Sequence, residues 1–340
     1  MKGYSMVRLF LKYIFCLLIL PTVAYSQSTM PVEIIITGKQ PGPPMWQVKN
    51  GENTLWIFAW LSPIPKNIFW ESEKVESVIA DAEEYIPRPS GGTSISKLVM
   101  FNPINIIRGI RLGRRISRND DGATLEEVLP AQLYERFAAL KAEYFPRDND
   151  IERLRPIAAA GRMVGHIQEA AGLVSADDVG KRIRRLVRRN RDIQVTEINY
   201  EMRIEGGFRD IADRVEEFMA SISPELELSC FERQLTQMEE DFSEMRYRAS
   251  TWAQGYVEEF RFIPLQRDEG DDCINMIATS TEQGTYEEVL TAMSSMWLDA
   301  VENALINNET TFAVLDINEL LLEGGLLAQL KARGYEVIEP

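Results

Sequence analysis

The chain has 340 residues, of which 45% are hydrophobic, and this size and composition favour one large folded domain or two small ones over a disordered protein. Its 52 acidic residues outnumber its 37 basic residues, which gives a net charge of −15 at pH 7. Such an acidic excess argues against nucleic acid as a partner and is a common feature of soluble proteins.

The first 26 residues are typical of a secretory signal peptide. Three basic residues begin the segment, an apolar stretch covers residues 13–23, and Ala24 and Ser26 then provide the small side chains that signal peptidase needs. The apolar stretch is shorter than the roughly 20 residues that span a bilayer, and it contains Pro21. We therefore expect cleavage after Ser26 rather than an uncleaved anchor, a periplasmic or secreted location, and no transmembrane segment in the mature chain.

Two cysteines remain after cleavage, because Cys16 lies in the signal peptide. An even pair in an oxidising compartment predicts a disulfide between Cys230 and Cys273, in preference to two buried free thiols. The bond would stabilise the fold by about 2–4 kcal/mol.

The mature chain is predicted to begin with an arm and to continue as one domain. Residues 27–44 contain a run of prolines and glycines that forbids regular structure, and residues 45–340 form the domain. The domain begins with a hairpin in which Asn50 and Gly51 supply the positive φ angles of the turn. Its second strand, residues 55–61, is apolar almost throughout, which is typical of a strand buried on both faces.

The middle of the chain, residues 98–306, is predicted to be mostly helical. Thr124 and Glu127 have the spacing of a capping box, and Pro146 ends the helix that they begin. Residues 90–93 are predicted to be a loop and residues 193–199 a strand. The predicted helices cover residues 70–86, 98–118, 124–144, 155–171, 175–191, 208–221, 225–260 and 285–305.

Two charged segments of this middle region allow more than one interpretation. The helix at residues 181–191 is rich in arginine, which fits an anionic ligand or lipid head groups, but a solvated face paired with acidic neighbours is favoured. Residues 267–272 gather four carboxylates, yet they lack the alternation and terminal glutamate of a calcium-binding EF-hand loop. A solvated loop is favoured there.

Little in the sequence supports common catalytic chemistry. His166 is the only histidine, and no Gly-x-Ser-x-Gly or phosphate-binding glycine motif occurs. One histidine and two paired cysteines cannot supply the ligands of a zinc hydrolase. We therefore predict no cofactor and no metal.

The last segment is predicted to contain a buried strand at residues 310–315, a helix capped by Asn318 and ended by Gly334, and a final strand at residues 335–338. Both ends of the chain then carry the segments that resemble a known family. These are Trp46-x-Val48, Leu55-Trp-Ile-Phe58, Pro63-x-Pro-Lys66 and Trp70 near the start, and Thr311-Phe-Ala-Val-Leu315 and residues 323–337 near the end.

On these residues the chain resembles the TraB/GumN-like proteins, relatives of the Tiki metalloproteases. The resemblance implies an α/β (α+β) fold whose central mixed sheet is formed by the two ends of the chain around a large helical insertion. It also implies that the strands at residues 55–61 and 311–315 share that sheet. Their carboxyl ends would then bring Ser62 and Glu319 together.

The family's two Gly-x-x-His motifs, which carry its proposed metal ligands, are absent from this chain. The first position reads Ala59-Trp-Leu-Ser62, the second reads Asp316-Ile-Asn-Glu319, and Ala292-Met-Ser294 stands where the family has Glu-Arg-Asn. The resemblance thus implies a non-catalytic member that binds an unknown envelope partner or ligand. The alternative is a metal-dependent hydrolase that uses carboxylates such as Glu319 and Glu197.

Overall fold

The computed structural model describes residues 42–240, 242–262 and 283–340. The predicted signal peptide, the acidic loop and Cys273 lie outside these ranges. The strands are β1 (Met45–Asn50), β2 (Asn53–Trp60), β3 (Ile64–Pro65), β4 (Glu84–Ile86), β5 (Ser90–Ile95), β6 (Leu173–Val174), β7 (Gln194–Val195), β8 (Asn199–Ile204), β9 (Thr310–Asp316) and β10 (Glu336–Ile338).

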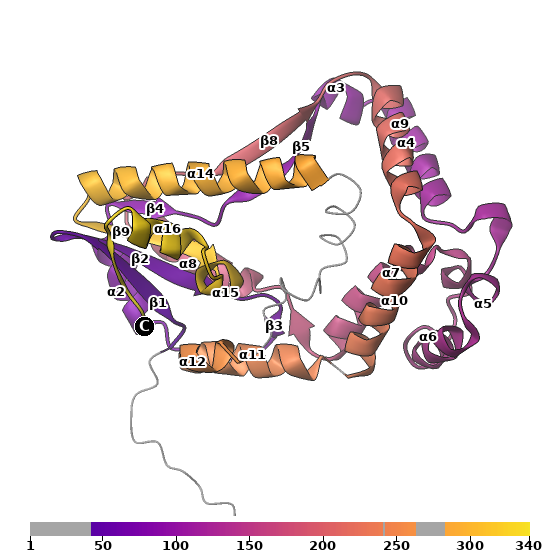
Figure 1. The fold of residues 1–340 in the computed structure, drawn as a ribbon, viewed down its shortest axis with the longest axis horizontal. Helices are drawn as coiled ribbons and strands as arrows, with labels where there is room; N and C mark the ends of the chain where they lie inside the picture. The colour runs from indigo at the N-terminus through magenta and orange to yellow at the C-terminus, as the bar shows by residue number, and fades with distance from the viewer. Residues whose placement is uncertain (1–41, 241, 263–282) are drawn as a thin grey trace, which may run out of the picture. The chain divides into compact units, whose positions relative to one another are not determined.

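Helices connect and cover these strands (Figure 1). They are α2 (Glu73–Asp81), α3 (Lys97–Met100), α4 (Pro103–Ile116), α5 (Leu125–Val128), α6 (Ala131–Tyr144), α7 (Pro156–Ala170), α8 (Asp177–Arg189), α9 (Phe208–Ser221), α10 (Pro224–Glu239), α11 (Ser243–Gln254), α12 (Val257–Phe260), α14 (Gln283–Asn307), α15 (Ile317–Leu321) and α16 (Leu326–Ala332), with short 3₁₀ turns η1 (Asp120–Gly122) and η2 (Ile151–Arg153).

A six-stranded mixed sheet in the order β10-β1-β2-β9-β4-β7 joins the two ends of the chain. β1 is antiparallel to both β10 and β2, whereas β2, β9, β4 and β7 run parallel. The α/β fold with a central mixed sheet, predicted from the resemblance, is confirmed. The hairpin is also confirmed, but Asn50 stays in β1 and only Gly51, with φ of 62°, takes the left-handed conformation of the turn.

The fourth strand of this order corrects one sequence prediction. Residues 84–86 form β4, whereas the apolar spacing predicted a helix through Ile86; helix α2 ends at Asp81. The carboxylate of Glu84 is satisfied in the sheet, because it accepts hydrogen bonds from Thr196 and from Asn308. A three-residue strand is too short to show a period, so its neighbours rather than its sequence determine its conformation.

β5 and β8 form a separate parallel pair that continues from β4 and β7. The sequence predicted a loop at residues 90–93, because glycines there disfavour a strand. Gly91 has a packing role: a Cβ atom at that position would lie 2.7 Å from the sulfur of Met293 on α14. The missing side chain therefore lets α14 lie close against β5.

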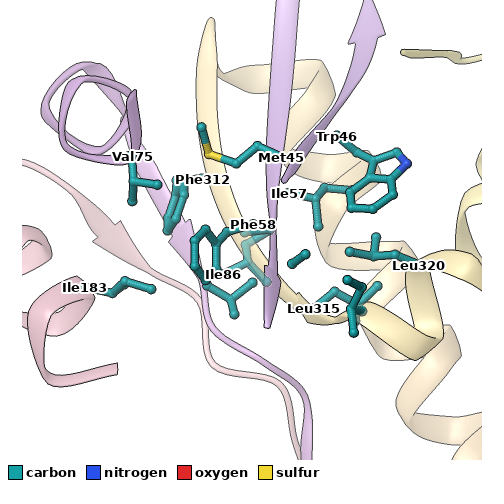
Figure 2. Packing of buried hydrophobic residues seen from close by; sticks show 14 of the residues in the cluster. Met45, Trp46, Ile57, Phe58, Val75, Ile86, Ile183, Phe312, Leu315 and Leu320 are labelled. Atoms are coloured by element: carbon teal, nitrogen blue, oxygen red, sulfur yellow. The ribbon is translucent and has the colours of Figure 1, made fainter. Parts of the chain in front are cut away.

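Side chains on both faces of the six-stranded sheet form one hydrophobic cluster, which we call the sheet core. Figure 2 shows Val75 of α2 and Ile183 of α8 on the side of Phe312, and Leu320 of α15 on the opposite side of the sheet. Trp252 of α11 and Trp297 of α14 are also fully buried in this cluster. Continuous burial on two faces explains the near-continuous apolar sequences of β2 and β9.

Helices α5, α6, α7 and α10 enclose a second cluster, which we call the helical core. Its largest fully buried side chains are Phe137 and Phe231, whose ring centroids lie 6.0 Å apart. The predicted capping box is present at the start of α5, where the backbone N–H of Thr124 donates to Glu127 over 2.7 Å. The helix does not continue to Tyr144, because it ends before Pro130 and α6 starts at Ala131.

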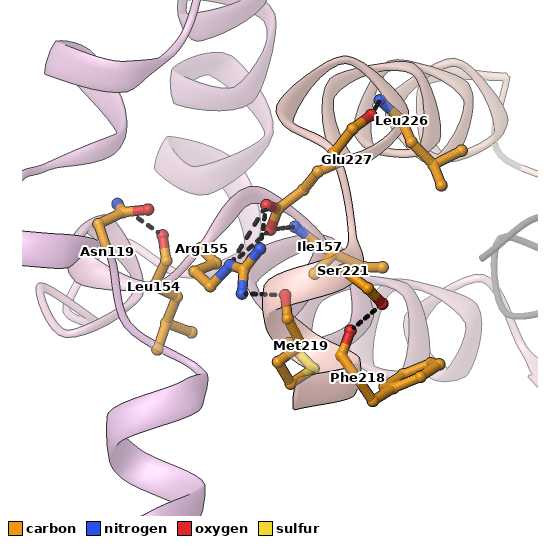
Figure 3. A network of polar contacts seen from close by, with 10 residues as sticks. Asn119, Leu154, Arg155, Ile157, Phe218, Met219, Ser221, Leu226 and Glu227 are labelled. Carbon is orange, nitrogen blue, oxygen red and sulfur yellow. Dashed lines mark hydrogen bonds and ion pairs between the residues drawn. The ribbon is translucent and has the colours of Figure 1, made fainter. Parts of the chain in front are cut away.

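A buried ion pair fixes the entry to α7 in this region (Figure 3). The guanidinium of Arg155 donates to Glu227 on α10, with the shortest distance 2.7 Å, and to the carbonyl of Met219 at 3.3 Å. The backbone N–H of Ile157 also donates to Glu227. The side chain of Glu227 is only 8% exposed, so these donors replace its lost hydration.

The long helix predicted at residues 225–260 is instead three helices, α10, α11 and α12. Phe242 interrupts it with a φ of 50°, a left-handed conformation that is uncommon for a bulky residue. Its side chain is buried in the helical core. Packing of that side chain offsets the cost of the turn, and the chain can then change direction into α11.

Candidate functional site

The carboxyl ends of four parallel strands lie along one edge of the sheet. Trp60 at the end of β2 is paired with Asp316 at the end of β9, so Ser62 and Glu319 follow two adjacent strand ends. The prediction that these two strands share one sheet and end at the same edge is confirmed. β4 lies beside β9 and adds Arg88 to this edge, and β7 lies beside β4.

Ser62 makes a structural contact at the start of α8. Its hydroxyl oxygen accepts a hydrogen bond from the backbone N–H of Ala176 at 3.2 Å. An unpaired donor at a helix start is costly when buried, and Ala176 is fully buried. The side chain at the first motif position thus helps to hold α8 against the end of β2.

Glu319 lies in the first turn of α15, beside a cavity of about 160 Å³. Asp316 caps this helix, since its carboxylate accepts from the N–H of Asn318 at 3.0 Å; the sequence had predicted Asn318 as the cap. Arg88, Asp316 and Glu319 supply the charged groups of the cavity wall. The rest of its wall is largely apolar, with Leu290, Met293, Leu315 and Leu326 among its residues.

Arg88 is the most distinctive side chain at this edge. Its guanidinium lies over the ring of Trp60, 4.7 Å from the centroid, and 4.0 Å from the carboxylate of Asp316. Trp60 in turn contacts α8 closely, because a Cβ atom on Gly180 would lie 3.1 Å from its ring. Nearly half of the Arg88 side chain is exposed, at 47%, so the stacked guanidinium remains accessible from solvent.

A second arginine, Arg184 of α8, lies close to the same place. A Cβ atom on Gly180 would lie 3.1 Å from its guanidinium as well as from Trp60. Burial raises the pKa of Tyr85 on β4 to about 12, and the positive charges of Arg184 and Arg88 partly oppose this shift. Both guanidinium groups are therefore near enough to Tyr85 to act on it electrostatically.

Helix α11 holds both motif positions by side-chain hydrogen bonds. The indole N–H of Trp252 donates to the carbonyl of Ala59 at 2.8 Å, and Arg248 donates to the side-chain oxygen of Asn318 at 2.6 Å. Arg248 is only 2% exposed, and its guanidinium lies 5.5 Å from the centroid of the Phe260 ring. The positions where the family has its histidine motifs are thus tied to buried protein groups.

The remaining predicted site residues do not join this arrangement. Glu197, just after β7, is exposed and accepts from Asn199 at 3.2 Å. His166 is exposed on α7 and contacts Phe145 with tilted rings, whose centroids lie 4.8 Å apart. Among the residues that the structure describes, no three His, Cys, Asp or Glu side chains are grouped so that they could hold a metal ion.

Cys230 is buried on α10 beside Ile222. Its predicted partner Cys273 is not among the described residues, so the disulfide stays a prediction. On the arginine-rich helix α8, Lys181 pairs with Asp178 at 3.0 Å and Arg182 pairs with Glu76 at 2.6 Å. These two contacts agree with the favoured interpretation of α8 as a solvated face with acidic neighbours.

The sequence did not single out Arg88, Arg248 or Trp252 as site residues. Arg88 follows β4 directly, so recognising residues 84–86 as a parallel strand would have placed it at the carboxyl edge. Arg248 and Trp252 lie one helical turn apart on α11. Nothing in their local sequence indicates which strand ends they contact.

The chain was compared with known protein families, curated proteins and solved structures. The family model of the TraB/PrgY/gumN family covers residues 44–339, which includes both strand ends of the site. No curated protein and no solved structure matches the chain. Within the described part of the chain, none of the helices has the length and apolar composition needed to cross a membrane. The matched region spans nearly the whole domain, and the chain therefore belongs to the TraB/PrgY/gumN family.

Proposed function

We propose that this chain is a non-catalytic family member that binds a small anionic ligand, such as a carboxylate or a phosphate, at the carboxyl edge of its sheet. The observation that carries the proposal is the guanidinium of Arg88, stacked on Trp60 beside the cavity. A guanidinium that makes a cation–π contact through its centre can still use its N–H donors for bidentate recognition of an anion. Arg184 adds a second positive charge nearby.

The ion pair within the site leaves room for such a ligand. The 4.0 Å separation between Arg88 and Asp316 exceeds a hydrogen-bond distance, and both side chains are more than two-fifths exposed. A contact of this kind contributes little to stability. An incoming carboxylate can therefore compete for the guanidinium at little cost to the fold.

The second candidate function is a metal-dependent hydrolase that uses carboxylates at the same edge. Its support is that Asp316 and Glu319 both line the cavity. The other members that the sequence suggested are engaged elsewhere, since Ser62 accepts from Ala176 and Glu197 accepts from Asn199. The anion-binding proposal uses the groups that the cavity does present.

Titration calorimetry with citrate and with inorganic phosphate tests the proposal. We expect saturable binding of at least one probe, weakened at least about tenfold by Arg88→Gln, since a charge-assisted hydrogen bond contributes about 1.5–3 kcal/mol. Arg88→Lys keeps the charge but loses the planar fork, so its affinity should be intermediate. Arg188→Gln, on an exposed arginine of α8, is the matched control and should bind as the unmodified chain does.

Metal analysis and a protease assay test the alternative, a metal-dependent hydrolase. Stoichiometric metal retained through purification, together with peptide cleavage that Glu319→Gln abolishes, would establish the hydrolase instead. In that case Arg88→Gln would leave metal content unchanged.

The proposal also includes export from the cytoplasm, based on the leader that the sequence predicts at residues 1–26. Intact mass of the protein from its native host tests this directly. We expect a mature chain that starts at Gln27 and has two hydrogens fewer than its reduced form, because Cys230 and Cys273 are bonded. A chain that retains Met1 would contradict export by cleavage.

A further inference from the structure

Helices α3 and α4 present an exposed surface that is both apolar and basic, which we call the α3–α4 surface (residues 97–116). It follows β5, beyond the β5–β8 pair (Figure 1). No side chain of α3 or α4 is buried. Six of its large apolar side chains are between 49% and 88% exposed, namely Leu98, Phe101, Ile104, Ile106, Ile107 and Ile110, whereas Val99, Leu112 and Ile116 are partly buried.

The opposite side of α4 is the one that packs on the protein. A Cβ atom on Gly109 of α4 would lie 3.7 Å from the ring of Phe208 on α9. Arg115 of α4 also forms an ion pair with Glu216 of α9. Ile106 and Ile110 are separated by four residues, so they lie on one side of α4. The structure therefore uses one side of α4 for packing and leaves Ile104, Ile106, Ile107 and Ile110 exposed.

Arginines are interleaved with these isoleucines. Arg108, Arg111 and Arg114 are all exposed, although the chain as a whole has a net charge of −15. Ile107 and Arg111 are four residues apart and share a side of the helix. Positive charge beside exposed apolar side chains is complementary to a surface that is anionic outside and apolar beneath.

We propose that the α3–α4 surface binds the anionic face of a lipid bilayer, with Phe101 and the isoleucines inserted at the interface and the arginines contacting head groups. Both the apolar side chains and the arginines would contact lipid in this arrangement. Apolar side chains on an exposed helix enter the boundary between head groups and acyl chains, while neighbouring arginines extend toward phosphates. The attachment is peripheral and independent of the ligand site on the sheet.

A second copy of the chain is a poorer occupant of the same surface. A two-fold contact through α4 uses the same surface of both copies. The exposed arginines of both copies, Arg111 and Arg114 among them, would then enter one interface, and like charges that are brought together lose their hydration without gaining a partner. An anionic bilayer satisfies both the charge and the apolar side chains.

Sedimentation of the full-length protein with vesicles tests the proposal. Vesicles of phosphatidylcholine alone are compared with vesicles that also contain phosphatidylglycerol, at low and high salt. We expect binding to the anionic vesicles only, reduced by salt. Arg111→Gln/Arg114→Gln should weaken partitioning about 30-fold, since each basic side chain at an anionic surface contributes about fivefold. Phe101→Ser/Ile107→Ser should weaken it at least about tenfold.

The matched control is Arg185→Gln/Arg188→Gln, which removes the same charge from exposed positions of α8. It should keep at least about half of the binding, and circular dichroism should show all three variants folded, because every altered side chain is exposed. Equal loss in the α8 control would overturn the proposal, since attraction would then be a diffuse charge effect. Failure of the unmodified protein to bind anionic vesicles would also overturn it, as would a concentration-dependent dimer that Phe101→Ser/Ile107→Ser abolishes.

Discussion

The sheet core and the helical core differ in how far apart in sequence their partners lie. In the sheet core, β2 pairs with β9 from Thr54 with Thr310 to Trp60 with Asp316, and the side chain of Asn53 donates to the carbonyl of Leu305 on α14 across a sequence separation of 252. In the helical core, Arg136 on α6 reaches Glu239 on α10 across a separation of 103. The sheet core therefore requires both ends of the chain, whereas the helical core can assemble from the insertion alone.

The two proposed binding functions also lie in different regions. The carboxyl edge, with Arg88 and Trp60, belongs to the sheet core, which both ends of the matched family region create. The α3–α4 surface belongs to the insertion. Substitutions in one region should therefore change the stability and binding of that region more than those of the other.

The largest expected effect comes from emptying either core. Phe312→Ala in β9 and Phe231→Ala in α10 should each lower the free energy of unfolding by about 3–5 kcal/mol, because both side chains are fully buried. Hydrogen exchange distinguishes the two. Phe312→Ala should accelerate exchange in β2 and β9, and Phe231→Ala should accelerate it in α7 and α10. Equal acceleration in both regions by either variant would show that the cores unfold as one unit.

The second effect concerns the polar group that the helical core buries. Glu227→Ala removes the acceptor of Arg155 and should cost about 2–4 kcal/mol in denaturant unfolding, since it leaves a largely buried guanidinium without its carboxylate. The control on the same helix is Glu239→Ala, whose partner Arg136 is more exposed. That change should cost less than about 1 kcal/mol. Similar costs would mean that the burial of Glu227 has no energetic consequence.

Several elements of both regions can be predicted from their own sequences. The buried strands 55–61 and 310–315 are apolar almost throughout, and α9 begins and ends where its periodicity predicts, at Phe208 and Ser221. These patterns arise because side chains of the segment itself are buried, so they are visible in its local sequence. The capping box at Thr124 is equally local.

Three features depend on contacts that no local pattern records. β4 is too short to show a period, β5 contains glycines because α14 passes close to Gly91, and Phe242 adopts a left-handed conformation because its side chain is buried. The residues of the candidate site also depend on contacts between segments that are distant in sequence. The resemblance placed the ends of β2 and β9 together, but Arg88, Arg248 and Trp252 reach that edge from other elements through folding.

The third effect should appear in alkaline solution and mainly in the sheet core. Burial raises the pKa of Tyr85 from 10.0 to about 12, so its folded form keeps a proton that the unfolded chain loses. Stability should therefore be unaffected below pH 10 and should fall as pH rises toward 12, by at most about 2–3 kcal/mol. Tyr85→Phe should remove this loss. Tyr134→Phe, at a less buried tyrosine of the helical core, should change the alkaline profile much less.

The smallest effect tests a contact at the rim of the sheet core. Hydrogen bonds from Ser72 and then Arg182 lower the pKa of Glu76, which lies on α2. A carboxylate with a lowered folded pKa stabilises the protein above its ordinary pKa, and that contribution disappears as pH falls through the folded pKa. Because the side chain is 42% exposed, solvent screens the pair and the gain stays below about 1 kcal/mol.

Urea unfolding of Glu76→Gln measures this contribution. The variant should be less stable than the unmodified chain at about pH 7, and the two should converge in acid, once the pH has fallen through the lowered folded pKa of Glu76. Glu52→Gln, in the exposed hairpin turn, is the matched control and should show no difference at either pH. A deficit in Glu76→Gln that persists in acid would mean that the shape of the side chain, rather than its charge, joins α2 to α8. The rim would then resemble the core beneath it, where packing rather than charge determines stability.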